Sequence, residues 1–442
     1  MQSLRRFVSL RALAACAVFV LLGSAFASAA GTLPRRGILG VGTADTNGAV
    51  TITAVLPCAQ AGLQKDDVIV SVDGAPVANS GDFVRKLRRP GGQPVTLGIK
   101  RGGTTMTVRP VLLEAPKESD PAVDTRYAAV EVDNSLRRAL VSAPHGASGK
   151  HPAVLFIGGI GCYSVDVASN PEDPYMRLAH DLAKRGFVSL RLEKSGVGDS
   201  QGPPCPTVDF VTETRSYAAA FDALRGEPDV DPAHVYIFGH SIGSVSGPRV
   251  ALDKNAAGVI VAEGVGIGWF EYELINSGRQ EELSGAAAAD VDRALLLKED
   301  CMHRLLIERK PRTTVLREKP ECADYTQYPA PDAYLQQIAP LDMAQPWTKL
   351  PVPVLAIYGS ADFVTDEADH QRIVSVVNAA HPGNGTLQVI PGMDHYLTNA
   401  ASQRASFDRV TKGGPPAPYD ARFSTAILAW LCARERCLPA TG

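Results

Sequence analysis

One serine in the sequence has the neighbours that a nucleophilic serine needs. The segment Gly239-His-Ser-Ile-Gly follows an apolar run, residues 235–238, and precedes residues 245–252, which can form a helix. A serine on a sharp turn between a strand and a helix requires small residues two positions before and after it, because larger side chains would clash there. Gly239 and Gly243 meet this requirement, so we expect Ser241 to be the nucleophile of an acyl-transfer reaction.

The same pattern occurs a second time, at Gly198-Asp-Ser-Gln-Gly. The pattern alone has little weight in a chain with 40 glycines, and its structural context has to decide. Two prolines, Pro203 and Pro204, follow this copy where a helix would have to begin. We therefore do not expect Ser200 to be a nucleophile.

An acid and a base for Ser241 follow later in the sequence. A serine hydroxyl needs a base to remove its proton and an acid to hold that base in one tautomer. Asp362 and His395 each come directly after an apolar run, and the carboxyl ends of parallel strands meet at one edge of a sheet. The order Ser241, Asp362, His395 therefore predicts a catalytic triad. Three alternatives stay open: Asp366 as the acid, His395 as a surface residue, and Ser241 as a helix cap.

The elements that must position these residues extend from residue 126 to the end of the chain. Apolar runs alternate there with helix-length segments, at residues 153–157, 187–192, 235–238, 258–262, 354–357 and 387–390. Such runs predict an α/β fold with a mostly parallel sheet covered by helices on both faces, and residues 127–141 predict an antiparallel hairpin at its edge. We expect a helical cap insertion over the site at about residues 267–350. The alternative is that these helices pack to one side of the domain.

A smaller unit precedes this domain. Residues 36–113 contain short alternating runs separated by Gly and Asp turns, with a helix expected at residues 80–87, and predict a small β-rich domain. Residues 114–125 are rich in Pro, Glu and Asp and predict a linker. The second domain would then occupy residues 126–442.

The three motifs around Ser241, Asp362 and His395 resemble those of the α/β-hydrolase superfamily, in the branch of capped esterases and serine aminopeptidases. The resemblance covers about residues 126–435, and the block from Lys194 resembles a glycine-rich loop of the same superfamily. It implies an oxyanion hole formed by the backbone N–H groups of Ile242 and Ile160, with Gly159 and Gly161 as near alternatives for the second donor. The His-Gly pair that the family often has at this second loop is absent.

The smaller unit resembles bacterial PDZ domains in Arg36-Gly-Ile-Leu-Gly-Val, in the block from Pro57 to Ile69, and in Val72-Asp-Gly-Ala-Pro-Val. The resemblance implies a loop that takes the terminal carboxylate of a peptide, formed by Gly37, Ile38, Leu39 and Gly40. The family usually has Gly where Asp66 stands. A docking or spacer domain that holds no peptide is the alternative.

The first thirty residues predict an export signal. Arginines precede an apolar run at residues 12–26, and small residues at Ala27-Ser-Ala29 suit cleavage near Ala29 or Ala30. An uncleaved anchor helix and a lipoprotein box ending at Cys16 are the alternatives. We therefore expect a periplasmic or secreted protein without a membrane span after cleavage.

Seven cysteines follow the signal, and in an oxidising compartment we expect disulfides between neighbours: 162 with 205, 301 with 322, and 432 with 437. One thiol would then be left over. No Cys-x-x-Cys occurs and no histidines are closely spaced, so no metal site is expected.

Charge and composition limit the partners. The 44 basic and 47 acidic residues nearly balance, which implies neither a nucleic acid nor a membrane surface as partner. Gly264-Val-Gly-Ile-Gly lacks the spacing of a nucleotide fingerprint, and no cofactor is expected. We expect a small ester or acyl substrate. A peptidase or aminopeptidase supplied by the PDZ-like domain, and a non-catalytic peptide-binding scaffold, are the alternatives.

Overall fold

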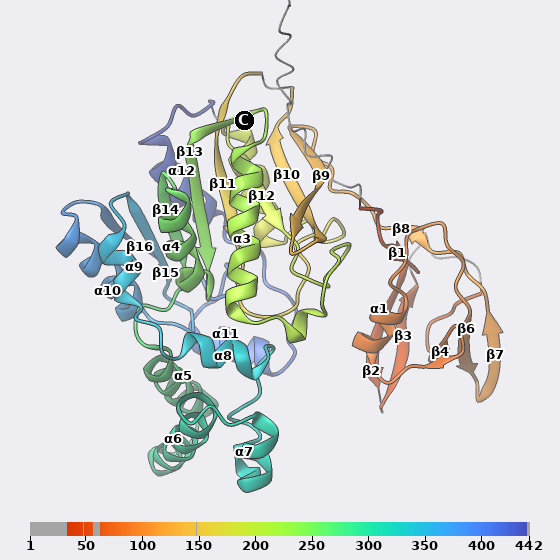
Figure 1. Ribbon diagram of the computed structural model, residues 1–442. Helices are drawn as coiled ribbons and strands as arrows, with labels where there is room; N and C mark the ends of the chain where they lie inside the picture. Colours follow the sequence, from red (N-terminus) through yellow and green to blue (C-terminus); the bar gives the residue numbers. More distant parts are fainter. Residues whose placement is uncertain (1–32, 47, 56–61, 147, 440–442) are drawn as a thin grey trace, which may run out of the picture.

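A computed structural model describes residues 33–46, 48–55, 62–146 and 148–439, which form two units that lie side by side (Figure 1). The expected cleavage site and Cys58 lie outside these residues. Within them, no helix is both long and apolar enough to cross a membrane.

The smaller unit is a β-rich domain with one helix. Its five-strand path runs in the order β2-β3-β4-β6-β7, β5 pairs with β4, and β1 pairs with β8 as a separate two-stranded sheet. Its elements are β1 (Gly37–Ile38), β2 (Val41–Thr46), β3 (Ala49–Val55), β4 (Val68–Val72), β5 (Ala75–Pro76), α1 (Ser80–Lys86), β6 (Leu97–Arg101), β7 (Thr104–Val108) and β8 (Leu113–Glu114). Asp66 adopts a φ of 70°, so an aspartate occupies the left-handed position where glycine is usual.

The larger unit is built on an eight-stranded sheet. Its order is β16-β15-β14-β13-β11-β12-β10-β9, and all pairs from β12 to β16 are parallel. The strands are β9 (Val123–Val132), β10 (Ser135–Pro144), β11 (His151–Ile157), β12 (Val188–Leu192), β13 (Val230–His240), β14 (Gly258–Ala262), β15 (Val354–Gly359) and β16 (Gly385–Ile390). The antiparallel hairpin of β9 and β10 lies at one edge. The expected α/β fold is confirmed.

Helices cover both faces of this sheet. One face packs against α3 (Phe210–Arg225), α4 (Gly243–Lys254), α9 (Ala344–Lys349) and α10 (Glu367–Ala380), and the other against α2 (Pro174–Lys184) and α12 (Ala421–Cys432). The short α11 (Gln403–Thr411) follows β16. Because both faces are buried, the central strands are almost continuously apolar, and every residue of β14 is buried.

The insertion between β14 and β15 contains α5 (Trp269–Ser284), α6 (Ala288–Met302), a π-helical turn (His303–Ile307), α7 (Arg312–Glu318) and α8 (Asp332–Ile338). In Figure 1 α5, α6 and α7 form a layer beyond one end of the sheet. The cap is shorter than the expected residues 267–350. Trp347 of α9 packs with the core of the main domain, so α9 belongs to the layer that covers the sheet.

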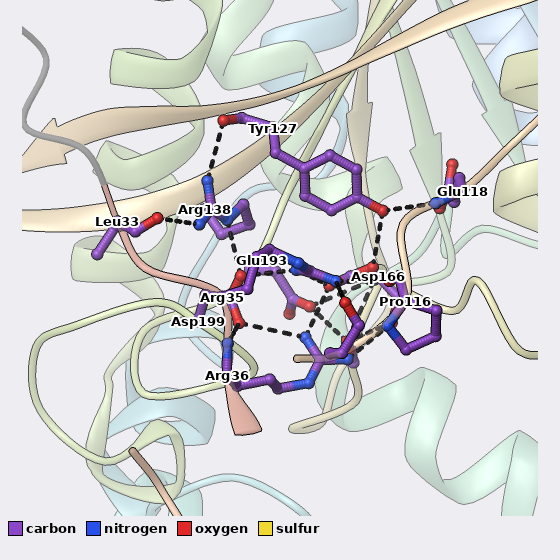
Figure 2. A network of polar contacts seen from close by, with 12 residues as sticks. Leu33, Arg35, Arg36, Pro116, Glu118, Tyr127, Arg138, Asp166, Glu193 and Asp199 are labelled. Carbon is purple, nitrogen blue, oxygen red and sulfur yellow. Dashed lines mark hydrogen bonds and ion pairs between the residues drawn. The ribbon is translucent and has the colours of Figure 1, made fainter. Parts of the chain in front are cut away.

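A buried network of charges joins the two units (Figure 2). Arg35, just before β1, contacts Asp166 at 2.5 Å and Asp199 at 2.7 Å, and Arg36 also contacts Asp166. Arg138 of β10 binds the same Asp199 carboxylate at 2.9 Å. Removing one member of such a buried network leaves another charge buried without a partner, which is strongly destabilising.

The segment between the units also packs against the larger one. Glu118 is buried and its carboxylate binds Arg191 of β12 with two hydrogen bonds of 2.9 and 2.6 Å. Residues 114–125 therefore do not form a free linker, since β8 includes Glu114 and β9 begins at Val123. The residue that holds this segment to the larger unit, Glu118, is charged, so a search of the sequence for apolar residues does not detect it.

Candidate active site

Ser241 lies on the sharp turn between β13 and α4. Its φ is 55°, in the left-handed region that few residues other than glycine adopt. A Cβ on Gly239 would lie 2.4 Å from the carbonyl oxygen of Gly243, and one on Gly243 would lie 2.5 Å from that of Ile157. Both glycines are therefore required by the close approach of the backbone, as the sequence pattern predicts.

Ser241, His395 and Asp362 form one continuous chain of hydrogen bonds. The Oγ of Ser241 lies 3.2 Å from Nε2 of His395, and Nδ1 of His395 lies 2.9 Å from Oδ2 of Asp362. The carboxylate accepts at Nδ1–H, which leaves Nε2 free to accept the serine proton. The three side chains come from the ends of β13, β15 and β16, so the sheet brings together residues up to 154 positions apart.

The Asp362 carboxylate is completely buried and well supplied with donors. The N–H groups of Val364 and Thr365 and the hydroxyl of Thr365 donate to it. Burial opposes ionisation, but His395 and the other donors outweigh it and hold the pKa of Asp362 well below its usual range.

The two alternative candidates lie elsewhere. Asp366 caps the first turn of α10 and pairs with Arg279 at 2.5 Å, so it supports the cap and α10. Ser200 is buried, donates to the carbonyl oxygen of Glu193 and accepts from the N–H of Arg138. Its hydroxyl is used in holding a loop, in agreement with the sequence interpretation.

The loop after β11 carries the expected second oxyanion donor. The N–H of Gly159 donates to the hydroxyl of Tyr175 at 3.3 Å, whereas the N–H groups of Ile160 and Ile242 have no acceptor among the described residues. Both isoleucines line the cavity that contains Ser241. The geometry therefore favours Ile160 over Gly159, and Lys194 holds the loop by donating to the Gly159 carbonyl oxygen at 2.7 Å.

His240 is a part of the site that the sequence interpretation missed. Its Nε2 lies 2.8 Å from the backbone carbonyl oxygen of His395, and its Nδ1 lies 2.7 Å from the Tyr175 hydroxyl. Burial, reinforced by the nearby His395, lowers the pKa of His240 to about 3, so the ring is neutral. The signal in the sequence is its place inside the Gly-x-Ser-x-Gly motif, next to the nucleophile.

The triad opens into a cavity of about 860 Å³ between the main domain and the cap. This size suits a small organic ligand. Its walls include Ser241, His395 and Ile160 from the main domain and Trp269, Tyr272 and Tyr328 from the cap. A buried ion pair between Lys298 and Glu273, 3.0 Å long, also lies in the cap wall. Residues of the insertion therefore line the same cavity as Ser241.

Three disulfides join the expected neighbours: Cys162–Cys205, Cys301–Cys322 and Cys432–Cys437. The first ties the loop that carries Ile160 to the glycine-rich loop after β12. The second closes the cap segment after α6. The pairing expected from sequence is thus present.

The expected peptide-binding loop lies at the start of the smaller domain. Gly37 and Ile38 form β1 and pair with β8, Leu39 packs in the core, and Gly40 has a φ of 69° before β2 begins. β2 is the end strand of its sheet, and Asp45 near its end accepts two hydrogen bonds from Ser80 at the start of α1. These residues thus lie beside an end strand of the sheet.

Two family models match the chain. Residues 172–401, more than half of the chain, match the model described as serine aminopeptidase, S33. Residues 37–110 match the model described as PDZ domain.

Single relatives match more weakly. Esterase EstD of Thermotoga maritima is 23% identical over 292 residues, which cover 66% of this chain and 64% of EstD. An uncharacterized protein of Mycobacterium tuberculosis is 29% identical over 148 residues, 33% of this chain and 48% of that protein. The chain therefore spans less than two thirds of the length of either relative.

Among solved structures, Est1E from Butyrivibrio proteoclasticus with bound ferulic acid is 16% identical, with a TM-score of 0.45, and the match covers 69% of this chain and 99% of Est1E. The Pyrococcus furiosus esterase Pf2001 is 12% identical, with a TM-score of 0.41, over 70% of this chain and 90% of that one. From the matched family model, the chain belongs to the serine aminopeptidase S33 family of α/β-hydrolases, with a PDZ domain on the N-terminal side of the hydrolase domain.

Proposed function

We propose that the protein is an exported serine hydrolase that cleaves carboxylic esters with Ser241, His395 and Asp362. The observation that carries the proposal is the unbroken hydrogen-bond chain from the Ser241 hydroxyl through His395 to Asp362, at the wall of a covered cavity. A serine that only capped a helix would need neither the left-handed turn nor this base.

The first half of the reaction transfers the acyl group to the enzyme. The Ser241 oxygen attacks the ester carbonyl carbon while Nε2 of His395 takes the hydroxyl proton. The N–H groups of Ile160 and Ile242 donate to the oxyanion that forms. When the carbon–oxygen bond to the alcohol breaks, the proton on Nε2 passes to the leaving oxygen, and an acyl-enzyme is left.

The second half uses water in the place of the alcohol. His395 removes a proton from the water, whose oxygen attacks the acyl carbon. The bond to Ser241 then breaks, the serine oxygen takes the proton back, and the carboxylic acid leaves. Asp362 stays ionised throughout and holds the imidazolium that forms twice in the cycle.

Two considerations favour esters over amides. The relative EstD is named an esterase. An ester also needs less assistance for its leaving group than an amide does. The description of the matched family as serine aminopeptidases keeps an aminopeptidase as the second candidate.

The test labels the mature protein with a fluorophosphonate probe, maps the label, and compares p-nitrophenyl esters with aminoacyl amides. We expect the label on Ser241, its loss in Ser241→Ala, and turnover of short-chain esters. Hydrolysis of the amides alone would favour the peptidase. A folded protein that takes no label and hydrolyses neither class would leave the scaffold interpretation.

We further propose that the signal-like N-terminus exports the protein and that the PDZ domain binds a peptide C-terminus at residues 37–40. Three disulfides in the described residues suit an oxidising compartment. Cell fractionation tests the first proposal, and a cytoplasmic enzyme that retains its first residues would contradict it. Binding of a C-terminal peptide library, with amidated peptides as controls, tests the second. Equal binding of amidated peptides would contradict carboxylate recognition.

A further inference from the structure

A second carboxyl group lies behind the triad, on a residue that the proposed reaction does not use. Glu263 directly follows β14, is completely buried, and lies beside the side chain of Asp362. A Cβ on Gly359 would lie 2.7 Å from Oε1 of Glu263, so the carboxyl packs against the end of β15, three residues before Asp362. This site between two strands is closed to solvent.

The backbone of Glu263 is in an unusual conformation. Its φ is 48°, in the left-handed region, where a residue other than glycine is strained by about 1–2 kcal/mol. Its N–H donates to the carbonyl oxygen of Ile357 at 3.1 Å, which fixes the chain against β15. Strain of this kind persists where the surrounding structure imposes it, often at a functional site.

Among the described residues, no donor has full hydrogen-bond geometry to either carboxyl oxygen of Glu263; the N–H of Gly359 lies close by and opposes protonation, but burial and the charge of Asp362 outweigh it. An ionised carboxylate that is buried without a donor or a cation is several kcal/mol less stable than the neutral acid. Asp362, in contrast, accepts from His395, Val364 and Thr365. If the two carboxyls share one proton, Glu263 is therefore the acid and Asp362 the anion.

The charged and titratable groups that the described part of the chain places near Glu263 leave this assignment unchanged. Asp394, the other acid close by, is occupied by Arg409. His370 of α10 accepts from the N–H of Gly264 at Nε2, and its Nδ1 lies 2.7 Å from the carbonyl oxygen of Asp366, so its ring is neutral. Burial, followed by the negative charge of Asp362, raises the pKa of Glu263 well above its usual range.

We propose that Glu263 stays protonated and donates its carboxyl proton in a hydrogen bond to Asp362, as a positioning residue for the acid that orients His395. The hydrogen bond adds a further donor to those that fix the Asp362 carboxylate. It also keeps a single negative charge behind the imidazole, because the second carboxyl is neutral. The kinetic part of this inference rests on the proposed function, whereas the protonation state does not.

Two neutral variants separate the roles of the proton and of the donor. Glu263→Gln keeps a donor and a similar shape, so we expect kcat within about threefold of the wild type and an unchanged acid limb of the kcat/KM profile. Glu263→Leu keeps the volume without a donor. We expect it to lose about tenfold in kcat and to shift the acid limb upward by about one pH unit, since Asp362 without this donor stabilises the imidazolium more strongly.

Two kinetic outcomes would overturn the proposal. A Gln variant whose acid limb moves to lower pH would mean that a negative charge had been removed. A Leu variant with the kinetics of the wild type would exclude the donor role.

An infrared difference spectrum of wild type minus Glu263→Gln at neutral pH decides the protonation state without any substrate. We expect the carbonyl band of a protonated carboxylic acid, and the bands of an ionised carboxylate would overturn the proposal. If the wild type takes no fluorophosphonate label, the proposed function fails while this spectrum still decides the state of Glu263.

Discussion

His240 donates its Nε2–H to the backbone carbonyl oxygen of His395 across 2.8 Å, so the residue before Ser241 holds the loop that carries His395. The hydroxyl of Tyr175 completes the arrangement. It accepts from the N–H of Gly159 and donates to Nδ1 of His240. One tyrosine and one neutral histidine therefore connect the oxyanion loop, the nucleophile turn and the histidine loop.

Substitution of His240 should lower activity without removing a reacting group. Glutamine can place its side-chain N–H close to the position of Nε2, so His240→Gln should keep kcat within about tenfold of the wild type. His240→Phe keeps a ring without the donor and should lose about 10- to 100-fold, because small displacements of the base are costly. Kinetics with a p-nitrophenyl ester and circular dichroism provide the measurement. Equal activity of the two variants would contradict this role.

The hydrogen-bonded arrangement of Ser241, His395 and Asp362 could be expected from the sequence because each of these residues leaves a local signal there. Ser241 lies between two required glycines, and Asp362 and His395 each end an apolar strand. Parallel strands bring such ends together at one edge of the sheet, so the order of the three residues along the chain was enough to expect them to be close in space. Tyr175 and Glu263 give no comparable signal, because their partners come from loops that are distant in sequence.

The acid of the triad is tested by two neighbouring aspartates. Asp362→Asn leaves the shape of the site but favours the wrong tautomer of His395, and we expect kcat to fall by about 10³- to 10⁴-fold. Asp366→Asn removes the charge that pairs with Arg279 and should leave kcat within about threefold, with a loss of about 1 kcal/mol in the free energy of unfolding. The reverse order of effects would assign the acid to Asp366.

The Cys162–Cys205 disulfide closes a long loop next to Ile160, the proposed oxyanion donor. In the chain-entropy model, a sequence separation of 43 corresponds to about 4 kcal/mol of stabilisation, against about 2 kcal/mol for the separation of 5 in Cys432–Cys437. The double variant Cys162→Ala/Cys205→Ala should therefore lose more stability in urea than Cys432→Ala/Cys437→Ala. It should also lose activity, because its loop carries the donor. Equal losses in both measurements would contradict this difference.

The buried charges between the units could not be predicted from the sequence. Arg36 stands at the start of the PDZ-like motif and Asp199 in a glycine-rich block, and nothing around either residue in the sequence indicates a buried ion pair. Glu118 lies in a stretch with few apolar anchors, and its partner Arg191 is a charged residue within the buried strand β12. Patterns of apolar residues reveal the cores of single domains but not a contact that is made by ion pairs.

Asp199→Asn tests this contact. Asp199 accepts from Arg35 and from Arg138, so the variant leaves buried guanidinium groups short of negative charge, and we expect a loss of about 3 kcal/mol in the free energy of unfolding. Calorimetry should then show the two units unfolding in separate transitions. Asp133→Asn, which affects an exposed pair with Arg215, is the matched control and should cost less than about 0.5 kcal/mol. Equal effects of the two variants would contradict a stabilising contact between the units.

Glu193 makes stability depend on pH in the neutral range. Burial is the main reason that the pKa of Glu193 rises from 4.5 to about 7. Between these values the folded protein holds a proton that the unfolded chain has released, so the free energy of unfolding falls as the pH rises, by on the order of 3 kcal/mol. Glu193→Gln cannot ionise. Relative to the wild type it should therefore become more stable from pH 4.5 to 7.5 in urea titrations. A difference between the two proteins that is constant over this range, or that changes in the opposite direction, would show that Glu193 is ionised in the folded protein.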